Sequence, residues 1–189
     1  MKIERFWNWL AKNYDDEVGE ETIAITKKHL KEDDAVLDFG CARGAYTVAL
    51  AGEVRKIAGI DISPRMIEFA QKKSSEIEFR TASIFDVEER YDVILAYNIL
   101  HLLKEASQSI QKIDELLMPE GRFISVSACL KETLILRIFG FFVSLFHIIQ
   151  LKRFTVSQLK QMISERFDIV ESKNFGPHHI LIAAVKREA

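Results

Sequence analysis

The chain has 189 residues, of which 48% are hydrophobic and 29% charged; these values exclude a disordered chain and suit one globular domain over residues 1–189. Its formal net charge of −2 gives no general attraction to polyanions, so we expect no nucleic-acid partner. Neither the number nor the placement of Cys41 and Cys129 indicates a disulfide framework or a metal site. The charged first residues lack the apolar stretch of a signal peptide, and we expect a cytoplasmic protein.

Two amphipathic helices are expected before the first strand. Apolar residues recur at helical spacing over residues 2–13 and again over roughly residues 18–31, where Asp33 and Asp34 end the pattern. We interpret residues 1–31 as a helical cap at the N-terminal side of the domain.

From residue 35 onward, short apolar runs alternate with helical stretches. Strands are expected at Ala35–Phe39, Lys56–Ile60, Ile77–Thr81, Tyr91–Ala96 and Arg122–Ala128. Helices are expected at Gly44–Gly52, from Pro64 after the N-cap Ser63, near residues 104–117 and from about Thr155. Because parallel strands joined by helices need right-handed crossovers, this alternation predicts an α/β fold with a parallel sheet covered on both faces. The tail predicts an antiparallel hairpin of Phe167–Ser172 and His178–Lys186.

The turn after the first strand, Asp38–Gly44, has the composition of a ligand-binding turn. In open parallel sheets, ligands bind beyond the carboxyl ends of the strands, where the strand order reverses. Gly40 and Gly44 let a ligand approach the backbone, and the helix that follows offers free N–H groups. Asp61 ends the second strand about 20 residues later, the spacing at which an acidic residue meets the ribose hydroxyls of a nucleotide.

The position of Asp38 distinguishes between two cofactor classes. A glycine turn with a distant acid also fits a nicotinamide or flavin dinucleotide, but Asp38, two residues before the first glycine, would repel a pyrophosphate. The carboxylate suits S-adenosylmethionine, which carries an α-ammonium and a sulfonium and has no phosphate. Ala42 in the middle of the turn also argues against close packing on a pyrophosphate. The pattern therefore favours S-adenosylmethionine.

Four segments carry a resemblance to a known family. Val36–Gly44, followed by Gly59–Pro64, resembles the signature of class I S-adenosylmethionine-dependent methyltransferases. Tyr91–Leu102 is similar to that family's fourth-strand segment, and Leu116–Phe123 to its turn into strand five. The opening Phe6–Asp15 resembles the N-terminal helix of the small-molecule branch, which includes quinone-biosynthesis methyltransferases. The resemblance implies a Rossmann-like seven-stranded sheet, mostly parallel, with an antiparallel last strand.

The resemblance also implies a set of cofactor-binding residues. Asp38 and Gly40 would hold the methionine end of the cofactor, and Asp61 would accept hydrogen bonds from the ribose. Tyr97 would line the region of the methyl group, and Tyr14 would close over the cofactor. The complete set is Tyr14, Asp38, Gly40, Cys41, Ala42, Gly44, Asp61, Ile62, Met66, Ser83, Ile84 and Tyr97.

Two positions depart from the family's pattern. Ala42 replaces the middle glycine of the turn and is tolerated there if its φ is negative. Ile62 would pack on adenine, but Ser83 stands where the family often has an acid that contacts the adenine amine. Asp86, three residues further on, could substitute for that acid.

Methyl transfer from a sulfonium is an in-line displacement with an activated leaving group, so the protein mainly has to align the acceptor and exclude water. A base is needed only for an acceptor that must lose a proton. His101, which follows the fourth strand and is expected at the mouth of the site, is the candidate, because its ordinary pKa is near the working pH. The alternative is a histidine that is merely packed or hydrated. No Cys/His/carboxylate spacing indicates a metal.

The segment 134–149 breaks the pattern because it is almost wholly apolar, with polar residues recurring on one helical face. It is too short and too polar on that face for a membrane span. We favour a helical lid, an insertion over residues 132–152 between strand five and the last helix. A homodimer contact, a peripheral membrane contact helped by Lys152 and Arg153, and a core helix without a functional role stay open.

Together, these features predict an enzyme that transfers the methyl group of S-adenosylmethionine to a small acceptor, apolar or lipidic in character. Two alternatives stay open. One is an NAD-type nucleotide-dependent oxidoreductase on the same sheet. The other is a non-catalytic module that binds S-adenosylmethionine and acts through residues 134–149.

Overall fold

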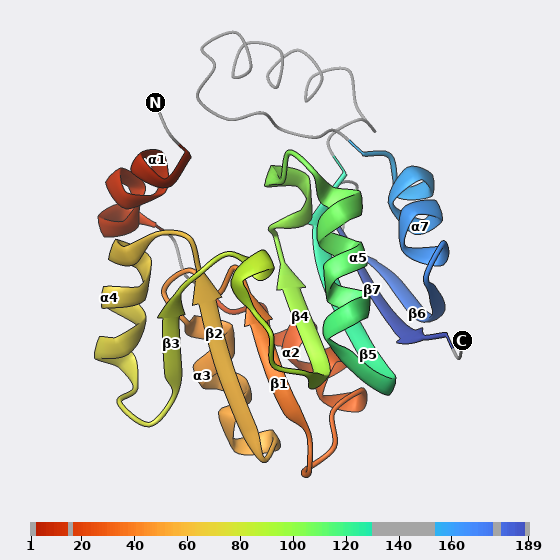
Figure 1. Cartoon of the computed structure of the whole chain (residues 1–189), viewed down its shortest axis with the longest axis horizontal. Helices are drawn as coiled ribbons and strands as arrows, with labels where there is room; N and C mark the ends of the chain where they lie inside the picture. The colour runs from red at the N-terminus through yellow and green to blue at the C-terminus, as the bar shows by residue number, and fades with distance from the viewer. Residues whose placement is uncertain (1–2, 15–16, 130–153, 176–178, 188–189) are drawn as a thin grey trace, which may run out of the picture.

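In the part of the chain that the structure describes, seven strands form one mixed sheet in the order β3-β2-β1-β4-β5-β7-β6 (Figure 1). The computed structural model describes residues 3–14, 17–129, 154–175 and 179–187. The strands are β1 Ala35–Phe39, β2 Lys56–Asp61, β3 Glu78–Thr81, β4 Tyr91–Tyr97, β5 Leu117–Ala128, β6 Phe167–Phe175 and β7 His179–Lys186. The first five strands pair in parallel, and β7 runs antiparallel to β5 and β6. The expected mostly parallel seven-stranded sheet with an antiparallel last strand is therefore confirmed.

Helices cover both faces of the sheet, as the alternation of strands and helices predicts. The helices α5 Ala106–Leu116 and α7 Val156–Ser164 bury their apolar residues against one face. The other face is covered by α2 Glu20–Lys28 and α3 Ala45–Leu50. The helix α4 Pro64–Lys73 packs on Phe79 of β3. The central strand β4 is almost entirely buried between these layers, which explains its long apolar run.

The helix starts follow the capping signals of the sequence. The Ser63 side chain accepts a hydrogen bond from the Met66 backbone N–H, and Pro64 takes the first helical position of α4. Thr155 caps α7 in a capping box with Gln158. Shorter 3-10 helices are η1 Ala11–Asn13, η2 Ala51–Glu53, η3 Ile84–Asp86 and η4 Leu100–Leu102.

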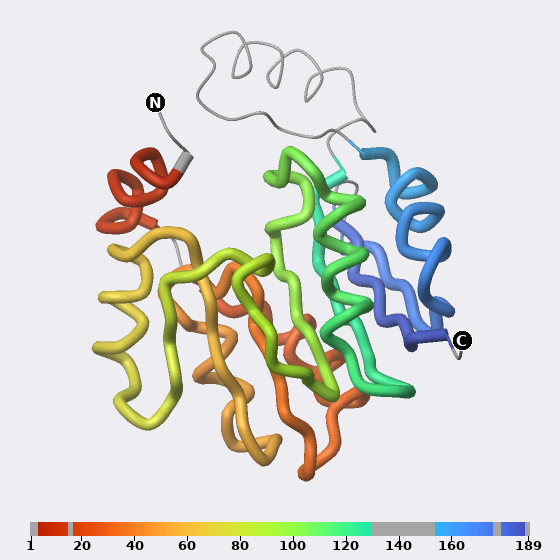
Figure 2. The backbone as a smooth tube through the Cα atoms, viewed as in Figure 1, coloured from red at the N-terminus to blue at the C-terminus, as the bar shows by residue number. Residues whose placement is uncertain are grey.

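The N-terminal helix α1 Ile3–Leu10 lies beside α4 (Figure 2). The Asn8 side-chain oxygen accepts hydrogen bonds from Ser63 Oγ at 2.7 Å and from the Arg65 backbone N–H at 3.2 Å. Asn8 thus satisfies a backbone donor in the first turn of α4, where the helix has no partner of its own. This contact holds α1 over the carboxyl end of β2.

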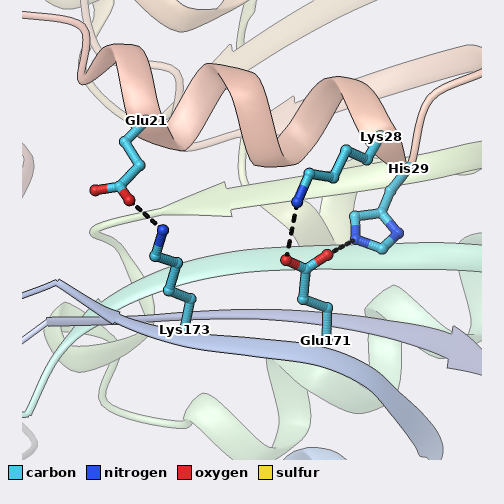
Figure 3. Close-up of polar contacts among 5 residues, drawn as sticks. All are labelled: Glu21, Lys28, His29, Glu171 and Lys173. Atoms are coloured by element: carbon cyan, nitrogen blue, oxygen red, sulfur yellow. Dashed lines mark hydrogen bonds and ion pairs between the residues drawn. The ribbon is translucent and has the colours of Figure 1, made fainter.

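Charged side chains join α2 to the edge strand β6 (Figure 3). Glu171 accepts hydrogen bonds from His29 Nε2 at 2.9 Å and from Lys28 Nζ at 3.4 Å. Glu21 pairs with Lys173 further along the same strand. The hydrogen bond from His29 is the main cause that lowers the pKa of Glu171. These pairs fix α2 across the sheet, and charged side chains on β6 discourage pairing of this edge with another strand.

The structure corrects the predicted start of β5. Arg122 is the expected first residue, but Leu117 already pairs with Tyr91, and the register shifts before Arg122 pairs with Val93. The intervening residues, with Glu120 at a φ of 59°, bulge out of the ladder. The turn signal Pro119–Gly121 therefore marks a bulge inside a longer strand.

The apolar segment 134–149 and the insertion 132–152 lie outside the described residues, as do residues 1–2. The lid, dimer, membrane and core interpretations of that segment therefore stay predictions. Within the described ranges, no helix is both long enough and apolar enough to cross a membrane.

Candidate functional site

The carboxyl ends of β1, β2 and β4 meet at one edge of the sheet. The chain passes from β1 to β2 on one side and returns to β4 on the other, so the strand order reverses at β1. Open parallel sheets bind ligands at such a position. The turn after β1, Asp61 at the end of β2 and Tyr97 at the end of β4 are therefore brought together, as predicted.

The glycine turn is tied to the neighbouring strand. The backbone N–H groups of Gly40 and Cys41 both donate to the Ile60 carbonyl oxygen, at 2.8 and 3.0 Å. Gly40 has a φ of 77°, and a Cβ there would lie 2.3 Å from Ile99 Cδ1. Glycine is thus required at position 40 both by its conformation and by the closeness of Ile99.

The expectation for Ala42 is wrong, because its φ is 49° rather than negative. An alanine in this left-handed conformation is strained by about 1 kcal/mol. The turn keeps this conformation because the Ala42 N–H donates to Asp61 Oδ2 at 3.1 Å.

Asp61 is held by two backbone donors. Besides Ala42, the Ser63 N–H donates to Asp61 Oδ1 at 2.8 Å. Burial raises the pKa of Asp61 above its usual value, and the two hydrogen bonds partly oppose that rise. Each carboxylate oxygen accepts one of these bonds and retains a further lone pair. Asp61 therefore presents a fixed acceptor pair toward a ligand.

Two adjoining cavities open at this edge and share lining residues from the turn after β1 and from the end of β4. The apolar cavity includes these predicted residues: Tyr14, Gly40, Ala42, Asp61, Ile62, Met66, Ser83, Ile84 and Tyr97. The polar cavity includes these: Tyr14, Asp38, Gly40, Cys41, Ala42 and Tyr97. The sequence did not predict the other described lining residues: Trp7, Glu17, Phe39, Tyr46, Phe85, Asn98, Ile99, Leu102, Leu103 and Ser109.

Gly44 is the predicted cofactor-binding residue that lines neither cavity. Its φ is 76°, and a Cβ there would lie 2.8 Å from Phe79 and 3.1 Å from Ala70. The structure therefore explains this glycine by its backbone conformation and by the close packing of the turn on β3 and α4.

Asp38 is buried, with 2% of its surface exposed. Thr47 Oγ1 donates to Asp38 Oδ2 at 2.6 Å, so a side chain of α3 orients the carboxylate that borders the polar cavity. The negative charge predicted before the glycine turn is thus part of the cavity wall.

Asp86 is engaged elsewhere. Its carboxylate accepts the Ser83 N–H at 2.8 Å in a capping box of η3. It is not among the residues that line the apolar cavity, so the structure does not place it as the substitute acid for the adenine amine. Ser83 itself lines the cavity.

The hydroxyl of Tyr97 is directed toward α2. Its Oη shares a hydrogen bond with Thr26 Oγ1 at 2.6 Å, and its ring lies 4.7 Å from that of Tyr46. Burial raises the pKa of Tyr97 far above its usual value. Tyr97 therefore contributes its ring to both cavities and stays protonated.

His101 differs from the expectation of a residue at the mouth of the site. Its side chain is buried and belongs to neither lining set. Burial, with a smaller effect of nearby His179, lowers the pKa of His101 to about 4. A neutral imidazole of this pKa is a weak base at neutral pH, and its role as a general base stays a prediction. The described residues contain no group of three or more metal-ligating side chains.

Several known proteins resemble this chain in sequence. Nodulation protein S of Sinorhizobium fredii is 29% identical over 100 residues, which is 49% of this chain and 46% of that protein. An uncharacterised methyltransferase of Schizosaccharomyces pombe is 28% identical over 62% of this chain and 50% of its own length. The matches thus span half or less of these relatives.

Solved structures share the fold. The N-methyltransferase NodS of Bradyrhizobium japonicum, in complex with S-adenosyl-L-homocysteine, aligns with a TM-score of 0.71 at 19% identity, over 89% of this chain and 85% of that chain. The magnesium protoporphyrin IX methyltransferase of Synechocystis, with the same ligand bound, aligns with a TM-score of 0.72 at 20% identity, over 97% and 94%. A family model described as a methyltransferase domain matches residues 30–175. The chain belongs to this methyltransferase domain family.

Proposed function

We propose that this protein transfers the methyl group of S-adenosylmethionine to a small, apolar acceptor. The observation that carries the proposal is the Asp61 carboxylate, held by two backbone N–H groups in the wall of a mostly apolar cavity. Support comes from NodS, an N-methyltransferase, and from the magnesium protoporphyrin IX methyltransferase, which were both solved with S-adenosylhomocysteine bound.

The residues present fit the cofactor part by part. Asp61 offers the acceptor pair that two ribose hydroxyls need, and Ile62, Met66 and Ile84 offer an apolar surface for adenine. Asp38 borders the adjoining cavity, where an ammonium and a sulfonium would meet a carboxylate. A dinucleotide fits less well, because its pyrophosphate would face that same buried carboxylate.

The chemistry that the cofactor supplies is an electrophilic methyl group on a good leaving group. The protein's own residues therefore have to bind, orient and exclude water. The Tyr97 ring, fixed by Thr26 and Tyr46, forms a rigid wall shared by both cavities. Because its hydroxyl is bound to Thr26, Tyr97 removes no proton from an acceptor.

The acceptor side of the proposal rests on apolar side chains at the opening of the site. Ile99, Leu102 and Leu103, which follow β4, line the apolar cavity together with Phe85, whose surface is 52% exposed. An apolar acceptor would cover such surface from water.

We place the reaction in a reducing compartment such as the cytoplasm, where the thiols of Cys41 and Cys129 stay reduced.

Substitution of Asp61 by alanine tests the proposal. Loss of hydrogen bonds to a charged acceptor costs about 1.5–3 kcal/mol, so binding of S-adenosylhomocysteine should weaken by roughly 10- to 100-fold in calorimetry. Asp168→Ala is the matched control, because Asp168 is an exposed carboxylate on β6 whose partner is Arg187. To test catalysis, the protein is incubated with S-adenosylmethionine and a panel of apolar amines, phenols and acids. The S-adenosylhomocysteine formed is then measured. Thermal protection by NAD(H) but not by S-adenosylhomocysteine would refute the proposal.

A further inference from the structure

Arg43, in the turn after β1, joins three parts of the chain. Its Nη1 donates a hydrogen bond to the Tyr14 carbonyl oxygen at 3.1 Å. Its guanidinium carbon lies 4.6 Å from the centre of the Phe69 ring on α4, within the range of a cation–π contact. One side chain thus connects the glycine turn to α4 and to residues 3–14, which we call the N-terminal segment.

The N-terminal segment forms part of the wall of the site. Tyr14 lines both cavities, and Trp7 lines the apolar one. The rings of these two residues lie 6.4 Å apart in an edge-to-face arrangement. The bond from Arg43 to the Tyr14 backbone therefore also helps to hold two aromatic side chains at the cavities.

The same turn contacts the acid that is predicted to bind the ribose. The backbone N–H of Ala42, the residue before Arg43, donates to Asp61 Oδ2 at 3.1 Å. A ligand that binds Asp61 and the turn would restrict the backbone at Ala42. Because Arg43 is the next residue, that ligand would also restrict the point from which the Arg43 side chain reaches Tyr14.

A purely structural role explains Arg43 poorly. Its Nε is buried and has no hydrogen-bond partner among the residues that the structure describes. A buried N–H without a partner destabilises the folded state, and an apolar side chain could pack on Phe69 without this cost. The arginine at this position therefore indicates a role in the function of the site.

We infer that Arg43 is a positioning residue that couples cofactor binding at the glycine turn to docking of the N-terminal segment over the site. The inference rests on the proposed function and deepens it. Because coupling between two events is reciprocal, a ligand bound at the turn stabilises the docked segment, and the docked segment strengthens binding of the ligand. Arg43 lines neither cavity, so it acts through the Tyr14 backbone.

Calorimetry and hydrogen exchange of the full chain with S-adenosylhomocysteine test the inference. In the wild type, the ligand should slow exchange over residues 3–14. Arg43→Met keeps an unbranched side chain that can pack on Phe69 and removes the donor to Tyr14. It should weaken binding by about tenfold and remove most of the slowing by the ligand. Arg43→Lys keeps a charged donor and should restore part of both effects.

Arg55→Met is the matched control. Arg55 Nε also donates to a backbone carbonyl oxygen, that of Asp33 at 3.0 Å, and Arg55 lines neither cavity. This substitution should leave both the affinity and the slowing unchanged. Phe69→Leu removes the ring beneath the Arg43 guanidinium and should weaken binding by about two- to fivefold. Adding Arg43→Met to Phe69→Leu should then cost less than in the wild type.

Three results would overturn the inference: no slowing of exchange over residues 3–14 in the wild type, equal slowing in Arg43→Met and the wild type, or unchanged affinity in Arg43→Met. If Arg43→Met does not fold, Phe69→Leu decides by the same two measurements. A wild-type chain that does not bind S-adenosylhomocysteine would instead refute the proposed function, so the two failures are distinguishable.

Discussion

Ala42 shows at the scale of one residue how the site stores strain. Its φ of 49° is one that glycine adopts freely and alanine does not. The left-handed conformation is kept because it directs the Ala42 N–H to Asp61. A strained residue that positions a ligand-binding group is a common compromise between stability and function.

Replacement of Ala42 by glycine should therefore stabilise the protein. Relief of the strain, less the entropy that glycine adds to the unfolded chain, should raise the free energy of unfolding in urea by up to about 0.5 kcal/mol. Ala49→Gly is the matched control, because Ala49 is exposed in α3 and its loss should lower stability by about 1 kcal/mol. If both substitutions destabilise alike, the left-handed conformation of Ala42 is not strained.

Most of the site residues predicted from sequence lie in or just after a strand, whereas Tyr14 and Met66 were assigned from the family resemblance. Asp38, Asp61 and Tyr97 could be assigned because the strand ends of a parallel sheet meet at one edge, which the alternation of elements already implies. Glu17 and Tyr46 could not, because their place depends on how a connecting segment crosses the glycine turn. The expectation for Ala42 failed because an alanine carries no signal of a positive φ, although the glycine that the family has at this position does.

At the scale of elements, α1 is held to the site by few contacts, and Asn8 provides two of them. Trp7 on the same helix lines the apolar cavity, so the docking of α1 completes part of the cavity wall. Other side chains of α1 are exposed; for example, Trp9 exposes 72% of its surface. The position of this helix should therefore respond to loss of a single side chain.

Asn8→Ala should weaken binding of S-adenosylhomocysteine by up to about 30-fold, because it removes two hydrogen bonds that each stabilise the docked α1 by about 1 kcal/mol. The free energy of global unfolding should change little, since the core does not include Asn8. Calorimetry measures the affinity, and hydrogen exchange over residues 3–14 should become faster. Lys12→Ala, an exposed position in η1, is the control. Unchanged affinity with faster exchange would show that α1 is not part of the binding site.

Element types were predictable where periodicity and capping agree, as in α4 after Ser63 and Pro64. The first and last residues of the elements were harder to predict. The strand β5 begins five residues before the expected Arg122 because Leu117 pairs with Tyr91 across a bulge, and this pairing depends on a neighbouring strand. Local sequence signals describe a turn at Pro119–Gly121 correctly but do not show whether the chain rejoins the same ladder after it.

For the whole molecule, the burial of His101 links folding to pH. Unfolding returns its pKa from about 4 to about 6.5, so between these values the unfolded chain binds the extra proton. The stability contributed by the neutral imidazole is complete above pH 6.5 and is lost as the pH falls toward 4. The full difference corresponds to at most about 3 kcal/mol.

His101→Asn should accordingly flatten the dependence of the unfolding free energy on pH between about 6.5 and 4, measured by urea denaturation. Asp61 contributes in the opposite sense, because its raised pKa favours the folded state when the carboxyl is protonated, and that contribution is lost as the pH rises through the raised value. His179→Asn is the control, since His179 is exposed and shifts the pKa of His101 only in part. A profile that stays as steep in His101→Asn would place the acid-sensitive group elsewhere.

A loss of turnover in the His101→Asn variant, with affinity for the cofactor unchanged, would instead support His101 as the general base. The same substitution therefore separates a role in folding from one in catalysis.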